Sequence, residues 1–347
     1  MLIVDIRFKQ MSDWLRNDLK LTVSRITPAS ADASFRRYFR VRINNKTFIV
    51  MDAPPDKEDC APFIRIAEAL HAMGLNVPRI EQANITDGFL LLSDLGEDSY
   101  LSLLSKDTAN QLYRDAIDAL IAMQKAGQDN ALTLPDYDSS LLMSEMALFR
   151  DWLLVRHLDL QLSDFECSML TTVFDLLTDN ALSQPQVWVH RDYHCRNLMV
   201  CHNNSGLNPG ILDFQDAVLG PMTYDLVSLL RDCYIEWPQV QQEQWRDYYC
   251  QCAEEYGLLA ADQGGGQRDQ FIRWLDLMGV QRHLKAAGIF ARLYQRDGKT
   301  AYMNDVLRTL SYICRLSGTY TELGGLIDLI EKRVLPLLPR DPLNSCL

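Results

Sequence analysis

Three side chains in the second half of the sequence carry the oxygen donors that group transfer needs. Asp192 is followed five residues later by Asn197, and Asp213 ends the next pair of short apolar segments. An aspartate in a loop after a strand can orient an attacking hydroxyl group or accept its proton. The Asn197 amide and the Asp213 carboxylate suit a hard divalent cation that also binds water and phosphate oxygens. This division of labour predicts phosphoryl transfer to a hydroxyl group, which depends mainly on positioning and charge neutralisation.

The elements around these residues occur in an informative order. An apolar segment, 187–189, precedes His190-Arg191-Asp192, and two more, 198–201 and 211–212, are separated by an Asn-Asn-Ser-Gly turn. An Asp and an Asn in one loop would alone indicate only turn chemistry, because both residues are common in turns. The full series of strand, His-Arg-Asp, Asn, strand, turn, strand and Asp-Phe is typical of a kinase.

The rest of the sequence divides into two regions of different periodicity. Apolar residues alternate in the first third, which predicts strands at 21–27, 35–43, 47–53, 79–83 and 89–92 and one long helix at 60–73. From Ser99 onward the spacing is helical, apart from the short strands beside Asp192. These two regions must position the three side chains.

Composition limits the classes of partner. The 34 Lys and Arg against 46 Asp and Glu give the 347 residues a net charge of -12, which repels nucleic acid and anionic membranes. Neither is expected as a partner, and no obligate protein partner is evident. The first 20 residues show no signal peptide or spanning segment. The nine cysteines lack C-x-x-C pairs, which favours reduced thiols. We therefore expect a cytoplasmic protein.

The Asp192 region resembles the aminoglycoside phosphotransferase and choline-kinase-like family. Segment 189–200 carries the likeness together with Leu212-Asp213-Phe214-Gln215-Asp216. His190 and His194 match that family's two-histidine version of the loop, and the resemblance extends over residues 24–316.

The resemblance implies a fold, cofactors and roles. It implies an α+β, bilobal protein-kinase-like fold, with a small antiparallel β-sheet lobe and one main helix in residues 1–95. Residues 96–347 would form a larger, mainly helical lobe that binds the acceptor. It further implies an ATP- and Mg²⁺-dependent small-molecule kinase, with Asp192 as the catalytic residue and Asn197 and Asp213 as metal ligands.

The nucleotide-binding lobe departs from the protein-kinase pattern. Protein kinases hold the ATP phosphates with a glycine-rich loop and a third-strand lysine. Here the loop 28–34 has no glycine, and Met51 stands where the lysine would be. Arg37 is a cation on the apolar face of its strand, so it needs either an ATP phosphate or an acid such as Glu68 as partner. The predicted nucleotide-binding residues are Ser34, Arg37 and, at the hinge between the lobes, Asp94, Leu95 and Gly96.

Both lobes also resemble one subgroup of the family, through segments 33–40, 50–55, 190–199 and 281–290. The subgroup comprises the anomeric sugar kinases of bacterial cell-wall recycling, which phosphorylate N-acetylmuramate and N-acetylglucosamine at the C1 hydroxyl. The resemblance implies that the acceptor is an amino sugar and that the reaction serves peptidoglycan recycling.

Three cations share one stripe of the predicted helix 268–296. Arg282, Lys285 and Arg292 recur at helical spacing, and an anionic acceptor such as a lactyl sugar could use them. The competing interpretation is a solvated or ion-paired helix face. The candidate acceptor-binding residues are His194, Arg196, Arg282 and Lys285.

Two alternatives to the amino sugar kinase remain open. The acceptor could be an aminoglycoside, an amino alcohol or an amino acid hydroxyl, since Asp192 is chemically compatible with each. The chain could instead be a nucleotide-binding pseudokinase, which Met51 and the glycine-free loop suggest, although Asp192, Asn197 and Asp213 oppose it.

Overall fold

The computed structural model describes residues 5–31, 35–128, 130, 132–202, 208–260 and 265–338. The chain forms two compact units. The first contains residues 1–103 and 197–216, and the second contains residues 104–196 and 217–347. The lobe boundary expected after residue 95 stays a prediction.

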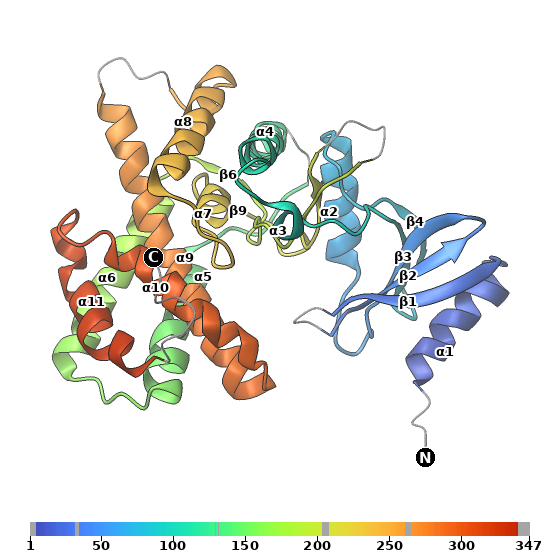
Figure 1. Cartoon of the computed structure of the whole chain (residues 1–347), viewed down its shortest axis with the longest axis horizontal. Helices are drawn as coiled ribbons and strands as arrows, with labels where there is room; N and C mark the ends of the chain where they lie inside the picture. The colour runs from blue at the N-terminus through green and yellow to red at the C-terminus, as the bar shows by residue number, and fades with distance from the viewer. Residues whose placement is uncertain are drawn as a thin grey trace. The chain divides into compact units, whose positions relative to one another are not determined.

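The first unit is built on a five-stranded antiparallel sheet (Figure 1), as the alternating pattern predicts. A long helix, α2, follows the third strand, as expected, and the sheet order is β1-β2-β3-β5-β4. The bounds are Val23–Ala31 for β1, Arg37–Ile43 for β2, Lys46–Asp52 for β3, Ile80–Asn84 for β4, Phe89–Ser93 for β5 and Ala61–Ala72 for α2.

Helix α1 (Ile6–Asp13), which continues into a π-helical turn, covers one face of this sheet (Figure 1). Its apolar side chains pack against alternate residues of β2, which are Phe39, Val41 and Ile43. The period-two spacing of β2 therefore places its apolar residues on the α1 side. Arg37 has the same parity, so it is directed to that side as well.

A short hairpin, β7 (Leu198–Met199) and β8 (Gly210–Ile211), also belongs to the first unit. The Val200 N–H donates to the Asp98 carbonyl at 2.8 Å, and β8 is bridged to Asn76. A Cβ at Gly210 would lie 2.9 Å from both Cys201 Sγ and Leu95 Cδ1. Glycine at position 210 therefore leaves room for these two side chains, which would have to shift to accommodate a Cβ.

The second unit is mainly helical, and its short antiparallel pair, β6 (Gln186–Val189) and β9 (Val218–Pro221), leads into and out of the Asp192 region. Helix α9 (Gly266–Asp297) packs against α5, α6, α7 and α10. The remaining helices are α4 (Ala109–Gly127), α5 (Ser139–Leu148), α6 (Asp164–Leu182), α7 (Tyr224–Leu230), α8 (Gln239–Glu255), α10 (Val306–Cys314) and α11 (Gly324–Leu329), and a π-helical segment, Phe149–His157, extends α5.

The sheet in the first unit and the helices in the second confirm the predicted α+β class. No helix within the described part of the chain is long and apolar enough to span a membrane.

Gly288 allows α9 to pack directly against the backbone at the end of α5. A Cβ there would lie 2.5 Å from the Phe149 nitrogen and 2.6 Å from Leu148 Cβ. We expect Gly288→Ala to lower the free energy of unfolding by about 1–3 kcal/mol, because backbone atoms would have to move. Gly266→Ala in the same helix is the control, since nothing lies within 4 Å of its added carbon. Denaturant unfolding measures both, and equal stability of the two variants would contradict this account.

Candidate active site

The Asp192 loop, defined here as residues 190–196, is held at its start by a buried carboxylate from α7. Asp225 Oδ2 accepts a hydrogen bond from the His190 N–H at 2.6 Å, and Oδ1 accepts one from the Arg191 N–H at 3.0 Å. Burial raises the pKa of Asp225 to about 7, although these two N–H groups act to lower it. Asp225 is fully buried, and its two hydrogen bonds hold the start of the loop in place.

The far end of the loop is held in the same way by Asp232. Its Oδ2 accepts the Cys195 N–H at 3.0 Å, and its Oδ1 accepts the Tyr234 N–H at 2.9 Å. Within the loop, the Tyr193 hydroxyl donates to the Ala116 carbonyl of α4 at 2.8 Å. Asp232 is buried, so both carboxylates act through backbone groups in a region shielded from water.

Asp192 lies between these two braces and is partly buried. Its N–H donates to His190 Nδ1 at 3.2 Å, and its carbonyl accepts the His194 N–H at 3.1 Å. Burial alone would raise the pKa of Asp192, but the charge of Lys285, followed by interactions with His194, His190 and Arg282, lowers it below its ordinary value. The Asp192 side chain is consequently a carboxylate at neutral pH and can accept a proton or a hydrogen bond.

A buried acid of α5 and a buried lysine of α9 support the loop. Glu145 is 5% exposed and pairs with Lys285 Nζ at 2.9 Å and with the Arg191 guanidinium at 2.5 Å. Lys285 Nζ also donates to the Tyr224 hydroxyl at 2.9 Å. Tyr137 donates to Glu145. Arg191 has a φ of 77°, which is costly for a residue other than glycine, and these bonds hold it there.

Sequence reasoning missed Glu145 and assigned no role to Asp232. The signal for Glu145 is its spacing, because it shares a helical face with the buried Leu142 and Phe149. An acid on such a face needs a buried cation as partner. Asp232 follows an apolar helix and carries no comparable signal.

Of the candidate acceptor-binding residues, three are buried in the same unit as Asp192. His194 is 8% exposed, and burial lowers its pKa, so its imidazole is neutral. Lys285 is engaged with Glu145. Arg282 is 6% exposed, and its Nη1 lies 3.5 Å from Cys233 Sγ. Arg196 is exposed, and its guanidinium stacks 3.5 Å from the ring centroid of Tyr234.

The two predicted metal ligands lie together in the first unit. Asn197 Nδ2 donates to Asp213 Oδ2 at 3.2 Å, and the Leu212 N–H donates to the Asn197 carbonyl at 2.9 Å. Gln215 Nε2 donates to Asp213 Oδ1 at 2.8 Å. Asp213 has a φ of 63°, an uncommon conformation, and the ring of Phe214 packs 4.8 Å from that of Phe63.

An adjacent amide and carboxylate fit a hard cation such as Mg²⁺, which usually takes one or two protein ligands and completes its shell with water and phosphate. Within the described ranges, no group of three or more His, Cys, Asp or Glu side chains is arranged for a metal. The donor set of Asn197 and Asp213 therefore suits an ion that arrives with its phosphate ligand.

Arg37 has two acidic partners on the α1 side of the sheet. Its Nη2 lies 2.6 Å from Asp52 Oδ2, and its Nη1 lies 2.5 Å from Asp5 Oδ2. Asp52 is fully buried and also pairs with Arg7. Glu68 is not among these partners, and the predicted contact of Arg37 with ATP stays a prediction. Ser34 lies outside the described residues.

Arg40 fixes the predicted hinge segment. It donates to the Asp94 carboxylate at 2.7 and 3.1 Å and to the Gly96 carbonyl at 2.6 Å, while the Gly96 N–H donates to Asp94. The Leu95 carbonyl accepts a weak hydrogen bond from Cys201 Sγ at 3.6 Å. Met51, at the position of the third-strand lysine, is fully buried between Tyr38 and Leu90 in the sheet register. The segment is therefore rigidly held, and its contact with adenine stays a prediction.

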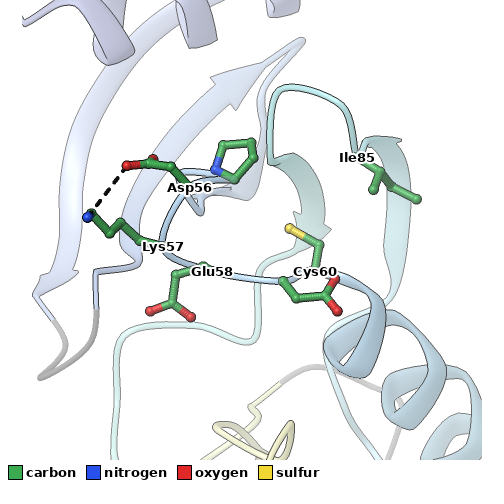
Figure 2. Close-up of a pocket in the computed structure, with 7 residues that line it drawn as sticks. Asp56, Lys57, Glu58, Cys60 and Ile85 are labelled. Carbon is green, nitrogen blue, oxygen red and sulfur yellow. Dashed lines mark ion pairs between the residues drawn. The ribbon is translucent and has the colours of Figure 1, made fainter.

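A pocket of about 380 Å³ in the first unit is lined by residues 55–60 and Ile85 (Figure 2). Its acids include Glu58, which already pairs with Arg36 at 3.0 Å, and Asp56, which lies 3.7 Å from Lys57. None of the predicted site residues lines it, so we do not include it in the candidate active site.

The charge of Glu145 should make stability depend on pH. Burial would raise the pKa of Glu145, but Lys285 and then Arg191 lower it below the ordinary 4.5. Its charge therefore stabilises the fold above pH 4.5, and this contribution is lost as the pH falls through the folded-state pKa. We expect Glu145→Gln to cost about 3–5 kcal/mol at pH 7, because the buried Lys285 and the partly buried Arg191 lose their partner.

Unfolding measured from pH 7 to pH 3 tests this expectation. The stability difference between wild type and Glu145→Gln should narrow below pH 4.5. Glu322→Gln, which removes an exposed ion pair with Arg273, is the control and should cost less than about 1 kcal/mol. A difference that stays constant across the pH range would show that the charge of Glu145 is not what stabilises the fold.

Comparison with known proteins places the chain in a family. Residues 25–261 match the model of the phosphotransferase enzyme family, APH. N-acetylmuramate/N-acetylglucosamine kinases from Pseudomonas putida and Neisseria meningitidis are 44% and 38% identical to it, each over 94% of this chain and 97% and 95% of their own.

Solved structures agree in fold. A GDP complex of an aminoglycoside 2'-phosphotransferase variant has a TM-score of 0.61 at 13% identity and covers 90% of this chain and 99% of its own. A choline kinase from Streptococcus pneumoniae has a TM-score of 0.58 at 14% identity, covering 88% and 98%. On the family match and the identity to these relatives, the chain belongs to the phosphotransferase enzyme family.

Proposed function

We propose that this chain is a kinase that transfers the γ-phosphoryl group of ATP to the C1 hydroxyl of N-acetylmuramate and N-acetylglucosamine. The observation that carries the proposal is the 44% identity, over 94% of the chain, to a relative with the name N-acetylmuramate/N-acetylglucosamine kinase. The ADP- and GDP-bound structures among its structural neighbours support the use of a nucleotide. The reaction would serve peptidoglycan recycling in the cytoplasm, where ATP is available.

In this proposal Asp192 acts on the acceptor. Its carboxylate, kept ionised mainly by Lys285, orients the C1 hydroxyl and takes its proton as the oxygen attacks the γ-phosphorus. The bond between that phosphorus and the oxygen of ADP breaks, and the proton passes from Asp192 to solvent. Asp225 and Asp232 hold the loop backbone, so the carboxylate is oriented before the acceptor arrives.

The cation would be Mg²⁺, held by Asn197 and Asp213, and it would neutralise charge on the transferred phosphate. Gln215 holds the Asp213 carboxylate from the other side. On the nucleotide side, the buried Met51 argues against a third-strand lysine contact. We infer that backbone groups of residues 94–96, fixed by Arg40, contact the adenine.

An acceptor panel with ATP and Mg²⁺ tests the proposed activity. ADP release and the position of phosphate on the product are measured for both amino sugars, an aminoglycoside, choline and an amino acid hydroxyl. We expect turnover on the two amino sugars with phosphate at C1. Turnover on another acceptor class alone would replace the amino sugars, and nucleotide binding without turnover on any acceptor would favour the pseudokinase.

Asp192→Asn tests the role of the carboxylate. We expect kcat to fall by about 10²–10⁴-fold, because the amide cannot accept the proton, with ATP binding retained. Asp175→Asn is the control, since Asp175 is exposed on α6. Near-wild-type turnover in the Asp192 variant would eliminate this carboxylate as the base.

A further inference from the structure

Three Arg or Lys side chains are buried in the described part of the chain, and they differ in how their charge is compensated. Arg36 is 9% exposed and pairs with Glu58 at 3.0 Å, and Lys285 is 8% exposed and pairs with Glu145 at 2.9 Å. Arg282 is 6% exposed, and no carboxylate of the described residues lies within 4 Å of its guanidinium nitrogens. It is thus the buried cation of this set without an ion pair.

The immediate surroundings of Arg282 leave much of its hydrogen-bonding capacity unused. Nη1 meets only a thiol, Cys233 Sγ at 3.5 Å, and Nε is buried without a protein hydrogen-bond acceptor. A guanidinium has five N–H donors in a rigid fork, and sulfur is a weak acceptor. Asp232, Asp225 and Asp192 interact electrostatically with this charge without forming an ion pair to it, and an anion in direct contact would compensate it further. A guanidinium binds a carboxylate or a phosphate through two parallel hydrogen bonds.

Arg282 is also positioned beside the elements that hold the Asp192 loop. Its contact residue, Cys233, directly follows Asp232, whose carboxylate holds the Cys195 N–H. One helical turn along α9, Lys285 contacts Tyr224, the neighbour of Asp225. An anion bound by Arg282 would therefore lie close to the acceptor of the reaction.

The other cations of the α9 stripe are less suited to this role. Lys285 already has a carboxylate partner, Glu145, which it shares with Arg191. Arg292 is ten residues further along the helix, which corresponds to about 15 Å at 1.5 Å per residue. Of the three cations in the stripe predicted from the sequence, Arg282 is therefore the best candidate for binding an anion.

We propose that Arg282 binds the lactyl carboxylate of N-acetylmuramate and so makes this sugar a better acceptor than N-acetylglucosamine. The inference rests on the proposed function. The two sugars differ at C3, where N-acetylmuramate carries the lactyl ether and N-acetylglucosamine a hydroxyl group, and the reacting C1 is common to both. Arg282 is therefore a specificity-determining residue, and Asp192 acts on both sugars alike.

The test compares kcat/KM for both sugars in wild type and in Arg282→Gln. We expect a loss of about 10- to 100-fold on N-acetylmuramate, as for a hydrogen-bonded charge pair, and less than about 3-fold on N-acetylglucosamine. Arg273→Gln, on the same helix with an exposed ion pair to Glu322, is the control and should change neither. Equal losses on both sugars would overturn the proposal and would instead assign Arg282 to the transferred phosphate or to Asp192.

A change on the substrate side keeps the test valid where Arg282→Gln fails to fold. The primary amide of N-acetylmuramate removes the anion, and wild type should use it about 10- to 100-fold less well than the acid. The amide should lose nothing more in Arg282→Gln. Equal use of acid and amide by wild type would overturn the inference and leave the kinase activity standing, whereas a wild type inactive on both sugars would remove the proposed function itself.

Discussion

The structure of the second unit depends on the compensation of charges that are removed from water when the chain folds. Its interior contains Glu145, Lys285 and the two carboxylates that hold the Asp192 loop, and each would be costly to bury alone. Glu145 is satisfied by cations, and Asp225 and Asp232 by backbone N–H groups. Lys285 in this interior lowers the pKa of Asp192, and burial lowers the pKa of His194, which keeps its imidazole neutral. The reactivity of the loop is thus set by the packing of α5, α7 and α9 around it.

The sequence predicted the parts that depend on local pattern. Alternation in β2 correctly placed Phe39, Val41 and Ile43 in the core, and helical spacing identified the second region. The sequence pattern did not reveal the partners of Arg37. Asp5 and Asp52 lie on other elements, and they meet Arg37 only once the chain has folded. The Glu145–Lys285 pair was missed for the same physical reason. Its residues are 140 positions apart, and local pattern carries no information about which distant helices meet.

In the first unit, a buried carboxylate is compensated by arginines of two different elements. The buried Asp52 receives two arginines, Arg7 and Arg37, so that one carboxylate joins α1 to β2 and β3. Arg40, which by strand alternation is directed to the opposite face from Arg37, joins β2 to residues 94–96. Cations of one strand therefore stabilise the helix on one side of the sheet and residues 94–96 on the other. Met51 of β3 is fully buried and contributes packing. It stands at the predicted position of the lysine that protein kinases have on their third strand.

The way Asp225 and Asp232 hold the loop has a consequence for how acceptor preference can diverge. Both carboxylates bind backbone N–H groups, which every residue except proline possesses. The anchoring is therefore indifferent to which side chains the loop carries. Positions such as 194 and 196 can exchange residues while the backbone that presents Asp192 stays in place. Substitutions on the acceptor side of the loop can therefore change the acceptor preference without moving the Asp192 carboxylate.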